Sequence, residues 1–232
     1  MNYFDTLEKR SHVKKYDMTK IPPKEKIERA LWKAWKTTPS KNQSMAYQCL
    51  VWGPDKAIHK EAIHSLAAKS HRAVEERAVK EGYQKNVQQG AGQFPNPYYE
   101  HIAFNPYLFT IHSRVSTPNR YYKAQIIKGH YYEQGYEELF ERIIDSVAVE
   151  VGIFAANLGY YLLEEGLDIG YNSCFRRRPE DWHKVGLTMV KTRPITMISC
   201  GYAKRFRRQD LKLTGKEDWD RRPELEEIIK WM

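Results

Sequence analysis

Hydrophobic and polar positions along the chain change between a helical period and a strand period. In KEKIERALWKAW, residues 24–35, apolar residues recur every three or four positions directly after two prolines, which helices accept in their first turn. This pattern predicts an amphipathic helix that ends before Pro39. The run AYQCLVWG, residues 46–53, predicts a short buried strand, and the charged segment 56–80 predicts a second helix.

The second half of the chain continues this alternation. PYLFTIHS, from Pro106, predicts a strand, and residues 137–165 predict a long buried helix whose small residues would let a second backbone approach closely. GLDIGYNS, from Gly166, predicts a short strand with a loop, and PITMISCGYA, from Pro194, predicts a buried strand. RPEDWHKVGL, from Arg178, predicts a capped surface helix, and RPELEEIIKW, from Arg222, a last helix or arm. Helices alternating with strands indicate an α/β or α+β sheet.

The composition narrows the class of protein. The chain has 232 residues and a formal net charge of +9, which suits an anionic partner but does not say whether that partner is RNA, a phosphate ester or nothing. Its three cysteines form no CxxC pair and none lies near a histidine at metal-ligand spacing, so neither a disulfide framework nor a metal site is indicated. The first ten residues lack an apolar core, and polar residues interrupt the longest apolar run. We therefore expect a cytoplasmic protein with no signal peptide and no membrane span.

A dense group of cations lies near the start of the chain, in KRSHVKKYD, residues 9–17. If this segment is extended, Arg10, His12 and Lys14 point to one side, and the Ser11 hydroxyl and the backbone N–H groups add further donors. That arrangement could hold a phosphate dianion. The alternative interpretation is a solvated basic segment that precedes a helix.

The order of several motifs resembles a known family. Arg-Ser-x-Val-Lys-x-Tyr, from Arg10, is followed by the proline-started helix, by Pro-Ser-x-Asn, from Pro39, and by a hydrophobic strand. Three more segments follow in the same order: DSVAVEVGIFAANLGYYLLEEGLDIGYNS, from Asp145; MISCGYA, from Met197; and DRRPELEEII, from Asp220. Together they resemble the FMN-dependent nitroreductase superfamily, and they cover roughly half of the chain.

The resemblance implies a fold. It implies an α+β protein with a central mixed, mainly antiparallel sheet flanked by helices, and with a long buried central helix at a dimer interface. Residues 1–232 would form a single nitroreductase-like domain with a variable tyrosine-rich insertion around 82–136 and a C-terminal arm at 216–232. From the apolar pattern alone, the long helix could equally be the core helix of a single subunit.

The resemblance also implies cofactor-binding residues. Those expected at the FMN phosphate and ribityl chain are Arg10, Ser11, His12 and Lys14, with Arg221 closing over the same phosphate. Those expected to reach the flavin ring from the second subunit of a homodimer are Pro39, Ser40 and Asn42. The loop 170–174, with Asn172 and Ser173, would lie beside flavin N5.

The implied chemistry belongs mostly to the cofactor. NADH or NADPH would reduce FMN, and a nitroaromatic, quinone or similar small aromatic acceptor would take the electrons in ping-pong turnover. No catalytic Ser, Cys or His and no metal is required. The implied partner is a second copy of the chain; neither a membrane nor a nucleic acid is expected.

The chain departs from the family pattern at several positions. Trp219 stands where the family often has Lys, and residues 43–45 replace the usual Gln-Pro-Trp. Asn96 is a candidate for the pyrimidine end of the flavin. For the tyrosine-rich middle, we predict that replacing Tyr131 and Tyr132 by Ala alters acceptor preference more than FMN affinity.

Other functions stay open at this stage. A basic, aromatic-rich chain could bind single-stranded nucleic acid by stacking and phosphate contacts, and the Arg176–Arg178 run could bind RNA or the phosphate of NADPH, although a solvated loop is its default interpretation. A member of the same family could instead dehalogenate an aromatic substrate or degrade the flavin. The histidines of the 56–80 helix are expected to be solvated, and Cys174 to be a small packed residue.

Overall fold

The computed structural model describes residues 3–8, 10–40, 45, 47–80, 100–113, 136–190, 192–204 and 228–229. In chain order the elements are α1 (Tyr3–Glu8), α2 (Lys24–Thr37), β1 (Tyr47–Trp52), η2 (Pro54–Lys56), α3 (Ala57–Lys80), α4 (Glu100–Ala103), β2 (Tyr107–Ser113), α6 (Tyr136–Glu164), β3 (Asp168–Asn172), α7 (Pro179–Lys184) and β4 (Pro194–Gly201).

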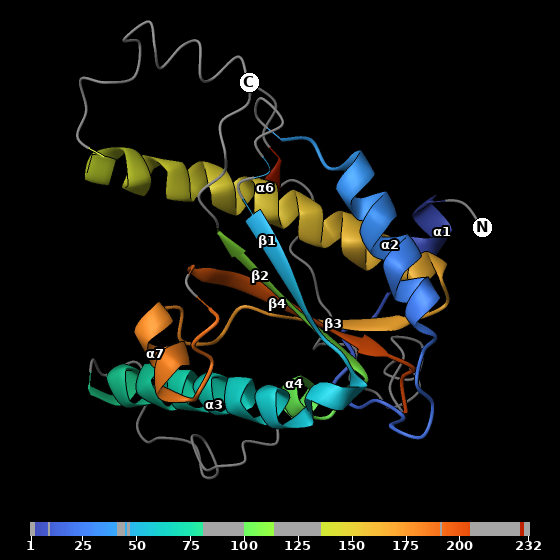
Figure 1. The fold of residues 1–232 in the computed structure, drawn as a ribbon, viewed down its shortest axis with the longest axis horizontal. Coiled ribbons are helices and arrows are strands. Elements are labelled where there is room, and N and C mark those ends of the chain that lie inside the picture. Colours follow the sequence, from blue (N-terminus) through green and yellow to red (C-terminus); the bar gives the residue numbers. More distant parts are fainter. Residues whose placement is uncertain are drawn as a thin grey trace, which may run out of the picture.

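The centre of the molecule is a four-stranded sheet in the order β1-β2-β4-β3, and each pair of neighbouring strands is antiparallel. Helices α2 and α6 cover one face of this sheet, and α3, α4 and α7 cover the other (Figure 1). The fold is therefore of the α+β class, as the resemblance implies, and the sheet between the helices is antiparallel throughout the described residues, where a mixed, mainly antiparallel sheet was expected.

Each face of the sheet has its own hydrophobic core. Successive side chains of β2 point to opposite faces, so Phe109 joins the core under α2 and α6 while Leu108 joins the core under α3 and α7. All seven residues of β2 are buried, because helices cover both faces and neighbouring strands flank it. Leu158 of α6 and Trp182 of α7 are fully buried in the two cores respectively.

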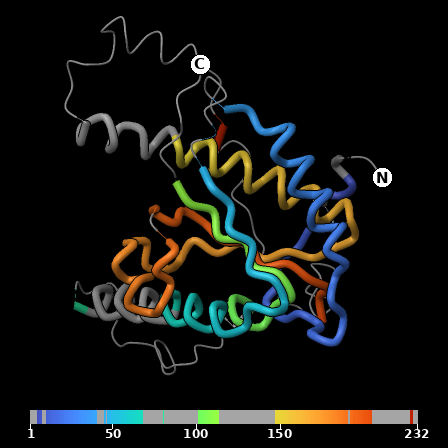
Figure 2. Tube along the Cα trace, viewed as in Figure 1, coloured from blue at the N-terminus to red at the C-terminus, as the bar shows by residue number. Residues whose placement is uncertain are grey.

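The long helix α6 packs one side against the sheet and against α2, which lies alongside it in Figure 2. Within the described residues, Val147–Glu164 is long and apolar enough to cross a membrane by length and composition alone, a test that the core helix of a soluble protein also passes. Of this window, 39% is buried inside the protein. Two of its exposed apolar side chains are Val149 and Ile153.

Most sequence predictions of elements are confirmed to within a few residues at each end. The helix predicted from Arg178 is confirmed as α7, with Glu180, His183 and Lys184 exposed, but the predicted side-chain cap is wrong. Arg178 at its N-cap makes no side-chain capping hydrogen bond, and the helix buries both Asp181 and Trp182. The short helices α1 and α4 were not predicted, because each is too short to show a period. The predicted arm at 216–232 lies almost wholly outside the described residues. Of the predicted tyrosine-rich insertion around 82–136, residues 100–113 and 136 are described, and they include α4 and the sheet strand β2.

A buried polar chain crosses the second core. Trp52 Nε1 donates to Thr110 Oγ1 (2.9 Å), and Thr110 Oγ1 lies 2.8 Å from His112 Nε2. The Thr192 carbonyl, 3.5 Å from His112 Nδ1, favours a neutral ring with its proton on Nδ1. His112 Nε2 then accepts from the Thr110 hydroxyl, whose oxygen accepts from Trp52. Burial lowers the pKa of His112 to about 4, so the ring is neutral at pH 7.

Candidate functional site

The cationic segment near the N-terminus is extended and follows the edge of the sheet. Val13 N donates to the Ile169 carbonyl of β3 (3.0 Å), Lys204 N donates to the Lys15 carbonyl (2.9 Å), and Asp17 N donates to the Tyr202 carbonyl (2.8 Å). These backbone bonds hold the segment by its main chain. Its side chains are therefore left for other contacts.

Two residues explain why the segment lies so close to the sheet. The buried Tyr16 hydroxyl donates to the Ser199 carbonyl (2.9 Å), and burial raises the pKa of Tyr16 well above its ordinary value. At Gly170 of β3, an added Cβ would overlap the Val13 carbonyl oxygen and lie 2.9 Å from Ser199 Oγ. Only glycine fits at that position, so β3 and the cationic segment are matched in shape.

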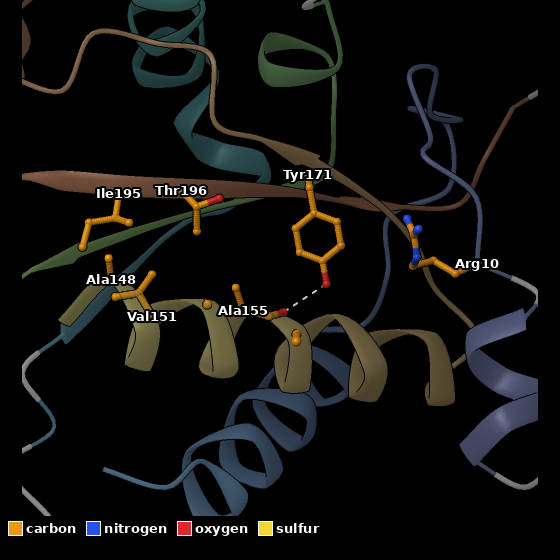
Figure 3. A pocket seen from close by; sticks show the side chains of 9 residues that line it. Arg10, Ala148, Val151, Ala155, Tyr171, Ile195 and Thr196 are labelled. Atoms are coloured by element: carbon orange, nitrogen blue, oxygen red, sulfur yellow. Dashed lines mark hydrogen bonds between the residues drawn. The ribbon is translucent and has the colours of Figure 1, made fainter. Parts of the chain in front are cut away.

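An open groove of about 420 Å³ lies between α6 and the sheet, next to this segment. Its lining residues are Arg10, Ala148, Val151, Gly152, Ala155, Ala156, Tyr171, Ile195 and Thr196. In Figure 3, Arg10 stands at one end, Ile195 and Ala148 stand at the other, and Tyr171 and Thr196 lie between them. The groove is therefore cationic at one end and apolar at the other, with a floor of small helical residues.

Tyr171 crosses from the sheet to the helix within this groove. Its hydroxyl donates to the Ala155 carbonyl of α6 (3.1 Å), as Figure 3 shows. Its ring lies under the Arg10 guanidinium, with 5.9 Å between the guanidinium carbon and the ring centroid. Gly159 makes room for the ring, because an added Cβ there would overlap the tyrosine hydroxyl.

Three more of the predicted phosphate ligands, Ser11, His12 and Lys14, lie in the same segment but are not lining residues of the groove. His12 stands edge-on to the buried His101, with 5.4 Å between ring centroids. Its pKa is lowered by desolvation and by the charges of Lys14 and Arg10, which favours a neutral ring at pH 7. The Lys14 side chain is exposed and Ser11 is half-buried.

Of the predicted ring-contacting residues, Ser40 contacts α6 on a side away from the groove. Ser40 Oγ donates to Glu150 Oε2 (2.8 Å) and accepts from Met45 N (2.9 Å), which ties the loop after α2 to the helix. Ala148 and Gly152 of the groove are each two positions from Glu150, about 200° around a helix. Within one subunit, Ser40 therefore does not reach the groove that Arg10 lines.

The loop after β3 is shaped by its own side chain. Asn172 is buried and its Oδ1 accepts from Cys174 N (2.9 Å), which forms a local turn. Ser173 and Cys174 are exposed just beyond the end of the strand. The expectation that Cys174 is packed is therefore wrong, and the Asn172 oxygen already has a backbone partner. The predicted ligands Asn42 and Arg221, together with Asn96, Tyr131, Tyr132 and Trp219, lie outside the described residues.

The arginine run after this loop has partners inside the protein. Arg176 Nη1 (3.3 Å) and Arg178 Nε (3.2 Å) donate to the buried carboxylate of Asp181, and Arg177 Nη2 donates to the Ser173 carbonyl (3.1 Å). These contacts lower the pKa of Asp181 against the opposing effect of its desolvation. The run is therefore partly structural and differs from the solvated loop that was the default expectation.

The charged helix α3 also differs from expectation. His64 is buried, and the His59 ring stacks on Trp52 with 5.5 Å between centroids. The Lys60 ammonium is buried and donates to the Asn105 carbonyl (2.5 Å), and burial lowers its pKa to about 8. In the part of the chain that the structure describes, His, Cys, Asp and Glu residues form no metal-binding group.

Sequence reasoning identified Arg10, included Tyr171 only as an unnamed member of the 170–174 loop, and missed Ile195 and Thr196. The signal for Tyr171 was weak but present: a glycine in the middle of an apolar helix and an aromatic residue in the following strand. Neither feature indicates a site by itself. Only the packing of β3 on α6 brings the two together.

Comparisons with known proteins agree on the fold. A nitroreductase-like protein from Streptococcus mutans matches with a TM-score of 0.63 and 15% identity, over 99% of this chain and 98% of that chain. A provisionally assigned nitroreductase from Exiguobacterium sibiricum in complex with FMN also gives 0.63, at 14% identity, over 100% and 98%. An iodotyrosine deiodinase bound to FMN and 3-iodo-L-tyrosine gives 0.57 at 17% identity, over 100% and 99%.

The chain therefore has the nitroreductase-like fold, in agreement with the resemblance seen in its motifs. A comparison with protein-family models and one with curated protein sequences find no match. The likeness is thus carried by the three-dimensional structure. At this level of identity it defines the fold, and the chemistry must be argued from the site.

Proposed function

We propose that this protein is a cytoplasmic, FMN-dependent oxidoreductase of the nitroreductase type. The observation that carries the proposal is the groove, which has a cation at one end, an apolar opposite end and a floor of alanine and glycine. FMN has the matching shape, with a phosphate at one end and a flat aromatic ring at the other. The fold likeness to structures that contain FMN supports the same cofactor.

The residues of the groove fit this cofactor in their chemistry. The planar guanidinium of Arg10 can bind two phosphate oxygens at once. The backbone that follows it is hydrogen-bonded to the sheet, which fixes the position of the Arg10 side chain. Ala148, Gly152 and Ala156 leave space for a ring to lie flat against α6. The three cysteines are free, as suits a reducing compartment.

FMN bound there would supply the redox chemistry, accepting reducing equivalents from NADH or NADPH and passing them to a nitroaromatic, quinone or similar acceptor in ping-pong turnover. The chain's own contribution is to bind the phosphate at Arg10, to orient the ring along α6 and to leave one side of the groove open to the two substrates. No side chain need form a covalent bond to either substrate.

The first test is optical. Purified without added cofactor, the protein should show the visible absorption of an oxidised flavin, release FMN on denaturation, and bleach when NADH or NADPH is added without oxygen. Acceptors added afterwards should restore the colour. A colourless preparation that neither binds added FMN nor bleaches would contradict the proposal.

We further propose a homodimer whose flavin sites are shared. Support comes from the position of Ser40, which one subunit keeps on the side of α6 away from its own groove. It also comes from the apolar side chains that α6 exposes, Val149 at 63% and Ile153 at 36%. A second copy packed on this face would cover them, and it could bring its own loop at Pro39 and Ser40 to the groove.

This proposal predicts that Ile153→Asp gives a monomer that loses FMN, because a carboxylate would be buried without a partner in the dimer interface. Light scattering would measure the mass, and visible absorbance would measure the flavin retained. The matched control is Ile58→Asp, because Ile58 is 80% exposed and belongs to α3, the helix that covers the other face of the sheet. A dimeric Ile153→Asp protein with full flavin content would contradict the shared site.

A second flavin chemistry has one observation in its favour. The fold matches an iodotyrosine deiodinase as well as nitroreductases. Iodide release from 3-iodo-L-tyrosine, measured beside the reduction of a nitroaromatic and a quinone, would separate the two. The proposal of a nucleic-acid binder has less support, because Arg29, Lys33, Arg176 and Arg178 are paired with carboxylates.

A further inference from the structure

We propose that Tyr171 is a specificity-determining residue of the groove, which holds the Arg10 guanidinium in place so that the site favours a phosphorylated flavin over the same flavin without its phosphate. This inference rests on the proposed function, because it names how the FMN groove selects its ligand. Its structural basis is that Tyr171, a residue of β3, contacts both Arg10 of the N-terminal segment and Ala155 of α6.

Arg10 carries the charge that a phosphate would meet in the groove. The guanidinium lies over the Tyr171 ring, 5.9 Å from the centroid, and none of the ion pairs among the described residues involves it. An aromatic face attracts a cation without neutralising it, whereas a carboxylate would occupy the same donors that a phosphate needs. The ring therefore orients the guanidinium while leaving its N–H groups for an incoming anion.

Tyr171 is held at both its backbone and its hydroxyl. Its backbone is paired within the sheet through Ile198 of β4, and its hydroxyl donates to the Ala155 carbonyl at 3.1 Å. The ring also fits the space left by Gly159, where an added Cβ would overlap the hydroxyl and lie 2.9 Å from Ile169 Cδ1. A side chain fixed at both ends is a firm support for a flexible arginine.

The Tyr171 ring has a central place in the groove. Tyr171 lies between Arg10 and the apolar end, so it is next to the point where a phosphate-bearing chain would meet the ring of the ligand (Figure 3). Tyr171 contacts the Arg10 guanidinium, which is the group proposed to bind the phosphate. No proton transfer is assigned to the tyrosine. Its role is therefore selection of the ligand.

The test compares affinities for FMN and riboflavin by titration of flavin fluorescence. Wild type should prefer FMN. Tyr171→Phe, which keeps the ring and loses the bond to Ala155, should retain that preference, whereas Tyr171→Leu should reduce it about two- to fivefold. In an Arg10→Ala background the preference should already be low, and adding Tyr171→Leu should not lower it further.

Equal weakening of FMN and riboflavin in Tyr171→Leu would overturn the inference, since a purely structural tyrosine would affect both ligands alike. Equal ratios of FMN to riboflavin affinity in Tyr171→Phe and Tyr171→Leu would also overturn the inference. The Phe variant is the control for folding, because it keeps the volume of the side chain next to Gly159. If wild type binds neither flavin, the proposed function itself has failed, and that result is distinct from an unchanged FMN-to-riboflavin ratio.

Discussion

Replacing Gly170 with alanine is expected to destabilise the protein by about 3 kcal/mol and to remove flavin binding at concentrations that saturate the wild type. The new methyl group would overlap the Val13 carbonyl oxygen and press on Ser199 Oγ at 2.9 Å, and the backbone atom cannot rotate away. The cationic segment would have to leave β3, which breaks the bond from Val13 N to the Ile169 carbonyl. Arg10 would then lose the backbone that places it.

Urea unfolding and a flavin titration would measure the two effects. Gly53→Ala is the matched control, because Gly53 has φ −76° and its added Cβ would meet an exposed aspartate side chain, Asp55 Oδ1, at 3.1 Å. That side chain can turn aside, so the control should change stability by less than about 1 kcal/mol. Wild-type affinity in Gly170→Ala would mean that the segment does not position the binding group.

Lowering the pH from 7 to 4 is expected to remove about 3 kcal/mol of stability through His112 alone. The pKa of His112 is about 4 in the folded protein, against an ordinary value of 6.5 for histidine, because the folded ring is buried. Below pH 6.5 the unfolded chain binds the proton and the folded protein does not, so stability falls as the pH falls. The contribution is fully present above pH 6.5 and fully lost below pH 4.

The measurement is the free energy of unfolding as a function of pH for wild type and for His112→Gln. The variant should be less stable at pH 7, because the contact with Thr110 Oγ1 is disturbed, but its stability should depend less on pH between 6.5 and 4. Acidic residues with lowered pKa values, such as Asp181 and Glu165, lose stability over an overlapping range in both proteins. The difference between the two curves therefore isolates His112, and parallel curves would refute the assignment.

The elements were predictable because their patterns are local. The stripe in residues 24–35 became α2, and the continuous apolar run from Pro106 became the fully buried β2. The position of Arg10 was also accessible, since the cationic segment proved to be extended along the sheet. In these cases the periodicity of a short segment determines which side chains share a side.

The remainder depends on contacts between distant segments. Lys60 belongs to a charged helix, yet it is buried because the turn after α4 brings the Asn105 carbonyl to its ammonium. Tyr171 became a groove residue because Gly159, twelve positions earlier in the numbering, left space for it. Ser40 was expected to reach the flavin of a second subunit, and its bond to Glu150 of α6 keeps it away from the groove of its own subunit. The pattern of residues within a single segment does not predict contacts of this kind between distant segments.

The cationic segment has one more consequence, which concerns the outer edge of the sheet. β3 is the last strand in the order β1-β2-β4-β3, and such strands can pair with other chains and start aggregation. Val13 occupies the outer side of β3 through its bond to Ile169, and the lysines beside it add charge there. The segment that carries Arg10 therefore also covers the edge strand and prevents its pairing with other chains. If the segment detached from β3, the protein would lose solubility as well as anion binding.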